Sequence, residues 1–140
     1  MPFRYPVFLE LQGKRAIVIG SFAVREGKDE QLRAAGARVS VFRDGEWQPD
    51  DLDGAFVCVA SSSDVAERRR IAREARARGV LVNVMDDVPN CDFAAPAIVR
   101  RGDLVLAIST GGRSPALARR LREELEARFG PEWAIVLDIL

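Results

Sequence analysis

The sequence of 140 residues contains no histidine, has only two cysteines and carries no net charge, because 21 basic residues balance 21 acidic ones. The absence of histidine removes the commonest general base and the commonest metal ligand in proteins. Cys58 and Cys91 lie far apart and lack C-x-x-C spacing, so we expect neither a metal site nor a disulfide framework. A neutral chain also argues against a nucleic-acid-binding protein, which usually carries a basic domain.

Long apolar runs are missing as well. No stretch reaches the roughly 20 residues that a membrane helix needs, and the N-terminal residues lack the apolar core of a signal peptide. We therefore expect a cytoplasmic protein with no membrane partner. The composition, 48% hydrophobic and 30% charged, is typical of a globular domain with a substantial core.

Four short, mostly apolar runs predict the strands of a parallel sheet, at residues 16–19, 38–42, 55–60 and 80–85. Runs of this kind are typical of strands buried on both faces. Segments 24–35 and 65–78 between them predict helices, each followed by a glycine at its carboxyl end. The alternation of strands and helices indicates an α/β fold with a parallel sheet.

Ligands of such sheets bind at the carboxyl ends of the strands. Gly20, the serines at 61–63 and Asp86 all follow predicted strands, so we expect them at that edge. A carboxylate there could accept a proton. The alternative for Asp86 and Asp87 is structural, because aspartate often ends strands by capping turns. For the arginine-rich helix at 65–78, a solvated face is the better interpretation.

After Pro89 the pattern changes. Two apolar runs on either side of Gly102-Asp103 predict a β-hairpin over 97–109. The loop from Ser109 to Ser114 opens a helix that we expect to end near Phe129, and its hydroxyls and guanidinium could bind anions. Residues 132–140 resemble the first turns of another helix, whose apolar side chains need a partner.

The first strand-to-helix turn is the place where a dinucleotide site needs its glycine fingerprint. The sequence there is Gly20-Ser21-Phe22-Ala23-Val24-Arg25, in which only the first glycine is present. Phe22 stands where a second glycine would let the backbone approach a pyrophosphate, and Arg25 stands where a small residue is usual. This turn alone does not indicate an NAD site.

Several segments in order nevertheless resemble the siroheme synthase N-terminal family. The chain opens with YPVFLELQGK at 5–14, similar to the family's P-x-F-L-x-L-x-G-K. It continues with AGARV at 35–39, DLDGAF at 51–56 and VNVMDD at 82–87. The most specific part runs from CDF at 91–93 through PAIVRRGDL at 96–104 to AISTGGRSPALAR at 107–119. The match spans nearly the whole chain.

The resemblance implies a Rossmann-like parallel sheet followed by a dimerisation hairpin and C-terminal helices. The implied domains are an NAD-binding-type domain at 1–88, a dimerisation and tetrapyrrole-site region at 89–129, and the start of a helical part at 130–140. The implied enzyme is a homodimeric precorrin-2 dehydrogenase, which oxidises precorrin-2 to sirohydrochlorin with NAD in siroheme or cobalamin synthesis. Some members also insert iron or cobalt.

The same resemblance assigns site residues. The aspartate after the N-V-x motif is the family's catalytic residue, and it falls on Asp86. The residues expected to bind the cofactor are Gly20, Ser21, Phe22, Ala23, Ser61 and Ser62. The residues expected to bind the tetrapyrrole are Asn83, Ser109, Thr110, Gly111, Gly112 and Arg113. A substrate with eight carboxylates suits an arginine-rich site.

Three departures from the family all fall on the NAD side. Relatives carry a glycine triplet where this chain has Gly20-Ser21-Phe22, a longer stretch where it has only 44–50, and A-T-D-D where it has Ser61-Ser62-Ser63-Asp64. One alternative is therefore a diverged member without NAD that binds or metallates sirohydrochlorin. Another is a Rossmann-like nucleotide-sensing or scaffold domain that binds no tetrapyrrole.

Overall fold

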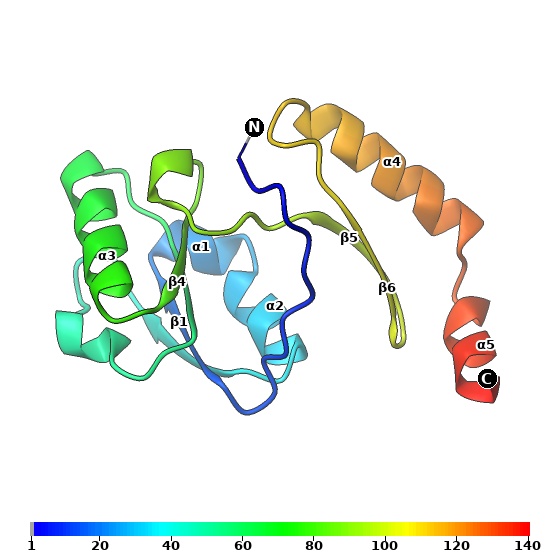
Figure 1. The fold of residues 1–140 in the computed structure, drawn as a ribbon, viewed down its shortest axis with the longest axis horizontal. Coiled ribbons are helices and arrows are strands. Elements are labelled where there is room, and N and C mark those ends of the chain that lie inside the picture. Colours follow the sequence, from blue (N-terminus) through cyan, green and yellow to red (C-terminus); the bar gives the residue numbers. More distant parts are fainter. Residues whose placement is uncertain (1) are drawn as a thin grey trace. The chain divides into compact units, whose positions relative to one another are not determined.

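The computed structural model describes residues 2–140, which form two units. One unit is Pro6–Ala94, and the other combines residues 2–5 with Ala95–Leu140. Both are drawn in Figure 1. Among the described residues, no helix is long and apolar enough to cross a membrane.

The Pro6–Ala94 unit is built on a parallel sheet of four strands. They are β1 (Arg15–Ile19), β2 (Arg38–Phe42), β3 (Val57–Ala60) and β4 (Leu81–Val84), in the spatial order β2-β1-β3-β4. All residues of β3 are buried, as are residues 16–19 of β1, which explains their continuous apolar sequence. The chain order reverses between β1 and β3, and such a switch point opens a crevice at the carboxyl ends of the strands.

Helices cover both faces of this sheet (Figure 1). Helix α3 (Val65–Ala77) packs on one face, where Ile71, Ala72 and Ala75 join the larger buried cluster. Helix α2 (Lys28–Ala34) packs on the other, with Leu32 against a smaller cluster that contains Leu11. The predicted α/β class and Rossmann-like parallel sheet are therefore confirmed.

The prediction of one continuous helix over 24–35 is wrong. The chain forms two short helices, α1 (Ser21–Arg25) and α2, separated by Gly27 in the left-handed region at φ +75°. Glycine adopts this conformation without steric cost, so it can end one helix and start the next. The charged composition of the segment carried no sign of the break.

The connection between β2 and β3 is short but well packed. It contains the 3₁₀ helix η1 (Pro49–Leu52) and buries Trp47 and Leu52 in the cluster beneath α3. The Trp47 indole N–H donates a 2.6 Å hydrogen bond to Glu67, and the Arg70 guanidinium lies 4.3 Å from the centre of the Trp47 ring. These side chains cover the sheet face between η1 and α3.

The second unit contains the predicted hairpin and helices. Strands β5 (Ala97–Arg101) and β6 (Leu104–Ile108) pair antiparallel, and α4 (Pro115–Arg128) and α5 (Glu132–Ile139) follow. The Ser114 hydroxyl caps α4 by accepting from the Leu117 N–H at 3.1 Å. A further 3₁₀ turn, η2 (Val88–Asn90), closely follows β4 in the first unit.

Candidate functional site

A cleft of about 440 Å³ lies at the carboxyl ends of β1, β3 and β4. This volume is within the usual range of small-molecule sites, about 300–1,000 Å³. The cleft is lined by Ser21, Phe22, Arg25, Asp44, Ser61, Ser62, Ser63, Arg68, Met85 and Asp86. The structure thus brings the β1–α1 turn, the serines at 61–63 and Asp86 together at the edge where the sequence placed them.

The β1–α1 turn is packed directly on Ser61. Gly20 has φ +103°, and a Cβ added there would lie 2.3 Å from the Ser61 carbonyl oxygen. The buried Ser61 hydroxyl accepts a 2.9 Å hydrogen bond from the Ala23 N–H. Gly20 is therefore required by contact with the neighbouring strand end, and Ala23 lies beneath the cleft rather than in its lining.

Asp44 is a cleft residue that the sequence reasoning did not assign. Its carboxylate accepts hydrogen bonds from the Ser21 N–H at 3.2 Å and the Ser21 hydroxyl at 2.9 Å. It lies just beyond the end of β2, where dinucleotide-binding folds place an acid about 20 residues after the first glycine to bind a ribose hydroxyl. That spacing from Gly20 was the available signal.

Helix α1 presents an aromatic ring and a cation to the cleft. The Phe22 side chain is 38% exposed, and the Arg25 guanidinium lies 5.6 Å from the centre of its ring. With the Ser21 and Ala23 N–H groups engaged by Asp44 and Ser61, this five-residue helix has few donors left for a phosphate. The turn therefore differs from a glycine-rich dinucleotide turn in structure as well as in sequence, because two of its N–H groups are already bonded.

Asp86 lies in a tight turn after β4. The Asp87 N–H donates to the Val84 carbonyl at 3.1 Å and closes the turn, and Asp86 has φ +61°. Aspartate tolerates this left-handed conformation better than most residues, yet a non-glycine residue there is uncommon. Strained positions of this kind cluster at functional sites. The exposed Asp86 side chain faces the cleft.

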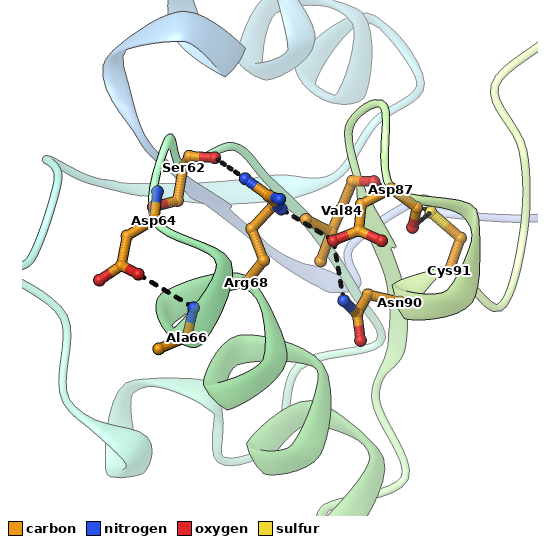
Figure 2. Close-up of polar contacts among 8 residues, drawn as sticks. All are labelled: Ser62, Asp64, Ala66, Arg68, Val84, Asp87, Asn90 and Cys91. Carbon is orange, nitrogen blue, oxygen red and sulfur yellow. Dashed lines mark hydrogen bonds and ion pairs between the residues drawn. The ribbon is translucent and has the colours of Figure 1, made fainter.

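Asp87, the second carboxylate of the pair, has a different environment (Figure 2). One of its oxygens accepts from the Asn90 amide at 2.9 Å and from the Arg68 Nε at 2.8 Å. The hydrogen bond from Asn90, followed by that from Arg68, holds the pKa of the Asp87 carboxyl below its usual range. The two neighbouring aspartates, which the sequence could not tell apart, therefore have different environments in the structure.

Arg68 corrects the interpretation of α3 as a helix with a solvated arginine face. Its side chain is only 23% exposed, it contacts Asp87, and its Nη1 also donates to the Ser62 carbonyl at 2.9 Å. Its neighbours Arg70 and Arg73 match the expected face better, with side chains 36% and 68% exposed and ion pairs to Glu67 and Glu74.

The donor set of the cleft fits a nucleotide. The Arg25 guanidinium can balance phosphate charge, and serine hydroxyls can bind phosphate oxygens. Asp44 can accept from a ribose hydroxyl. The described part of the chain holds no group of three or more cysteine, aspartate or glutamate side chains that could bind a metal ion.

The residues expected to bind the tetrapyrrole are not part of this cleft lining. The Asn83 amide donates to the Phe93 carbonyl at 2.9 Å, beside the cleft's strand β4. Residues 109–113 lie in the second unit, between β6 and α4. There the Thr110 hydroxyl bonds the backbone of Ser114, the Ser109 hydroxyl accepts from the Gly111 N–H, and Arg113 is exposed. Their role stays a prediction.

Comparison with known proteins identifies the family. Residues 7–97 match the family described as "Putative NAD(P)-binding", and residues 101–128 match "Sirohaem biosynthesis protein central". The chain belongs to the siroheme synthase N-terminal family. It is 40% identical to siroheme synthase 1 of Cronobacter sakazakii over 141 aligned positions, and 36% identical to siroheme synthase of Photorhabdus laumondii. Each alignment covers 87% of this chain.

These two relatives are longer proteins, and the chain spans only 30% of the length of each. A solved structure described as "SirC, precorrin-2 dehydrogenase" matches with a TM-score of 0.75 and 24% identity, covering 96% of this chain and 75% of that one. At this identity the likeness establishes the fold. The predicted family and fold are confirmed. The family match over residues 7–97 supports the binding of a nicotinamide nucleotide by the first unit.

Proposed function

We propose that the chain is an NAD-dependent precorrin-2 dehydrogenase of siroheme or cobalamin synthesis. The observation that carries the proposal is Asp86, a carboxylate with no hydrogen-bond partner in the described part of the chain, held in a strained turn at the cleft. Family membership supplies the substrate class, since both curated relatives are siroheme synthases. Oxidation of precorrin-2 removes a hydride and a proton.

In this proposal NAD accepts the hydride when it is bound, and Asp86 receives the proton. An exposed carboxylate with no hydrogen bond among the described residues is free to take up that proton and pass it to water. Arg25 and the cleft serines bind the phosphates. Gly20 and Ala23 shape the turn through their contacts with Ser61.

We further propose that Asp44 makes the cofactor NAD rather than NADP. A carboxylate there accepts from the 2′-hydroxyl of the adenosine ribose and repels a 2′-phosphate. Its hydrogen bonds to Ser21 hold it in the cleft wall, which supports this role.

For the tetrapyrrole, we propose that Asn83 and the loop 109–113 contribute contacts to its carboxylates. Arg113 is the loop's guanidinium, and it is exposed. We also propose a homodimer in the cytoplasm. The second unit exposes large apolar side chains that a second copy could cover, at Ile98, Leu117, Trp133, Ile135 and Ile139.

A second candidate, a family member that binds or metallates sirohydrochlorin without NAD, is favoured by the β1–α1 turn. Asp44 and Ser61 already occupy two of the amides that would face a pyrophosphate, and Phe22 replaces a glycine. This candidate predicts tetrapyrrole binding without any effect of NAD.

An anaerobic absorbance assay of precorrin-2 with and without NAD separates the two candidates. NAD-dependent formation of sirohydrochlorin by the wild-type chain, lost in Asp86→Asn with tetrapyrrole binding retained, supports the dehydrogenase. Full activity of Asp86→Asn removes the role assigned to Asp86. Tetrapyrrole binding with no turnover supports the second candidate.

A further inference from the structure

The left-handed turn that presents Asp86 is held from outside by one arginine. Arg68 lies near the start of α3, and its guanidinium lies between Asp87 and Ser62 (Figure 2). On one side its Nε donates to Asp87 at 2.8 Å, directly after Asp86 in the chain. On the other its Nη1 donates to the Ser62 carbonyl at 2.9 Å. The planar guanidinium suits such a double contact, which a lysine could not reproduce.

The arginine is itself anchored to a rigid element. Helix α3 is fixed by the buried Ile71, Ala72 and Ala75, and the Asp64 carboxylate caps it by accepting from the Ala66 N–H at 2.9 Å. Helical side chains lean toward the N-terminus, which directs Arg68 toward the β3–α3 turn. The pair with Asp87 is also shielded, since the two side chains are 23% and 16% exposed.

Other contacts converge on the same turn but leave Asp86 itself unsupported. The Cys91 thiol donates to the Val84 carbonyl at 3.0 Å, and the Asn90 amide donates to Asp87. The Met85 N–H also donates to the Ala60 carbonyl at 2.8 Å, so the turn is held at Val84, Met85 and Asp87. Of these contacts, only those of Arg68 also tie it to the opposite wall of the cleft at Ser62.

We propose that Arg68, through its pair with Asp87, is the positioning residue that holds the Asp86 carboxylate toward the cleft. This inference rests on the proposed function for its kinetic consequence. Without Arg68, the strained turn keeps the backbone bond from Met85 to Ala60 but loses its side-chain link to Ser62, and Asp86 is held less closely in its reactive position. Misplacement of a reactive group by about 1 Å can cost about 100-fold in rate.

The same helix offers a matched control. Arg76 has the same pattern of contacts, with its Nε 3.0 Å from Asp92 and its Nη2 donating to the Pro89 carbonyl at 3.2 Å. It too links α3 to the segment after β4, but it is not among the cleft residues. Arg68→Gln and Arg76→Gln each remove one guanidinium with comparable partners. A difference in kcat between the two variants therefore reports the effect of holding Asp86 in place.

The test compares wild type, Arg68→Gln, Arg68→Lys and Arg76→Gln by steady-state kinetics and by amide hydrogen exchange without cofactor. We expect Arg68→Gln to lower kcat about 10- to 100-fold with KM for precorrin-2 little changed. We also expect faster exchange of the Asp87 N–H, which closes the turn. Arg68→Lys keeps the charge and should lie between wild type and Arg68→Gln. Arg76→Gln should match wild type in both measurements.

Equal kcat for Arg68→Gln and Arg76→Gln overturns the positioning role, as does unchanged exchange at Asp87 in Arg68→Gln. If Arg68→Gln does not fold, Arg68→Lys decides: wild-type kcat and exchange in that variant overturn the proposal. A wild-type chain that does not oxidise precorrin-2 overturns the proposed function instead. The exchange comparison then still decides whether Arg68 holds the turn.

Discussion

The strain at Asp86 leads to a prediction in which two variants differ in stability although both lose activity. Asp86 has φ +61°, and its exposed side chain has no hydrogen-bond partner among the described residues. Removing the side chain therefore costs no contact, and the backbone conformation decides the effect. We expect Asp86→Gly to be more stable than Asp86→Ala, with both variants inactive as precorrin-2 dehydrogenases.

The magnitude follows from two opposing terms. The left-handed conformation costs an L-residue roughly 1–2 kcal/mol, and glycine avoids this cost. Glycine also loses more conformational entropy on folding, by roughly 0.5–1 kcal/mol relative to alanine. The net difference is about 1 kcal/mol in favour of Asp86→Gly, which corresponds to about 3 °C in Tm for a chain of this size. Asp86→Asn should stay near wild type, because asparagine tolerates the same conformation.

Thermal unfolding of the three variants measures this order directly, and the anaerobic assay measures their activity. Gly45→Ala is a useful control, since Gly45 has φ +73° with no atom within 4 Å of the added Cβ, so it shows the backbone cost alone. An Asp86→Ala protein as stable as Asp86→Gly would refute the reasoning, because the turn would then not need a left-handed residue.

Three further predictions concern the cleft and the core. Gly20→Ala should destabilise the fold by about 3 kcal/mol in urea unfolding, because its Cβ would lie 2.3 Å from the Ser61 carbonyl oxygen at φ +103°; a loss as small as that of Gly45→Ala would contradict this. Burial raises the pKa of the Cys58 thiol to about 12 from 9.0, so between these values only the unfolded chain ionises and stability falls as pH rises. At pH 10 the loss is about 1.4 kcal/mol relative to pH 8, and a Cys58→Ala protein with the same decline would refute it. Asp44→Asn should narrow the preference for NAD over NADP about 10-fold in calorimetric binding, and an unchanged ratio would remove Asp44 from cofactor selection.

The parts of the fold that depend on local pattern could be predicted. Strands β1 and β3 follow from apolar runs that only a sheet covered on both faces can bury. The hairpin follows from two apolar runs around Gly102-Asp103, and Ser114-Pro115 marks the start of α4. The break at Gly27 was missed because the surrounding charged residues are equally compatible with one helix or two.

The candidate site was predictable only in part. Asp86 and the serines follow strands, so the topology of a parallel sheet brings them to one edge. Asp44 lies in a polar connection, and its significance depends on Ser21, which belongs to another turn. Arg68 looked like one arginine among several on a charged helix, because helix periodicity describes a face and does not show which side chain reaches a neighbouring turn.

Hydrophobic periodicity and ordered motifs are local properties of the chain, so the family, the parallel sheet and the sheet edge that holds the cleft could all be predicted from the sequence. The different environments of the two aspartates became visible in the folded structure. Asp87 is ion-paired with Arg68 and accepts a hydrogen bond from Asn90, whereas Asp86, in a strained turn, has no hydrogen-bond partner among the described residues. Arg68 and Asp87 are 19 positions apart, and their pairing depends on how α3 packs beside β4. No property of either segment alone contains that information.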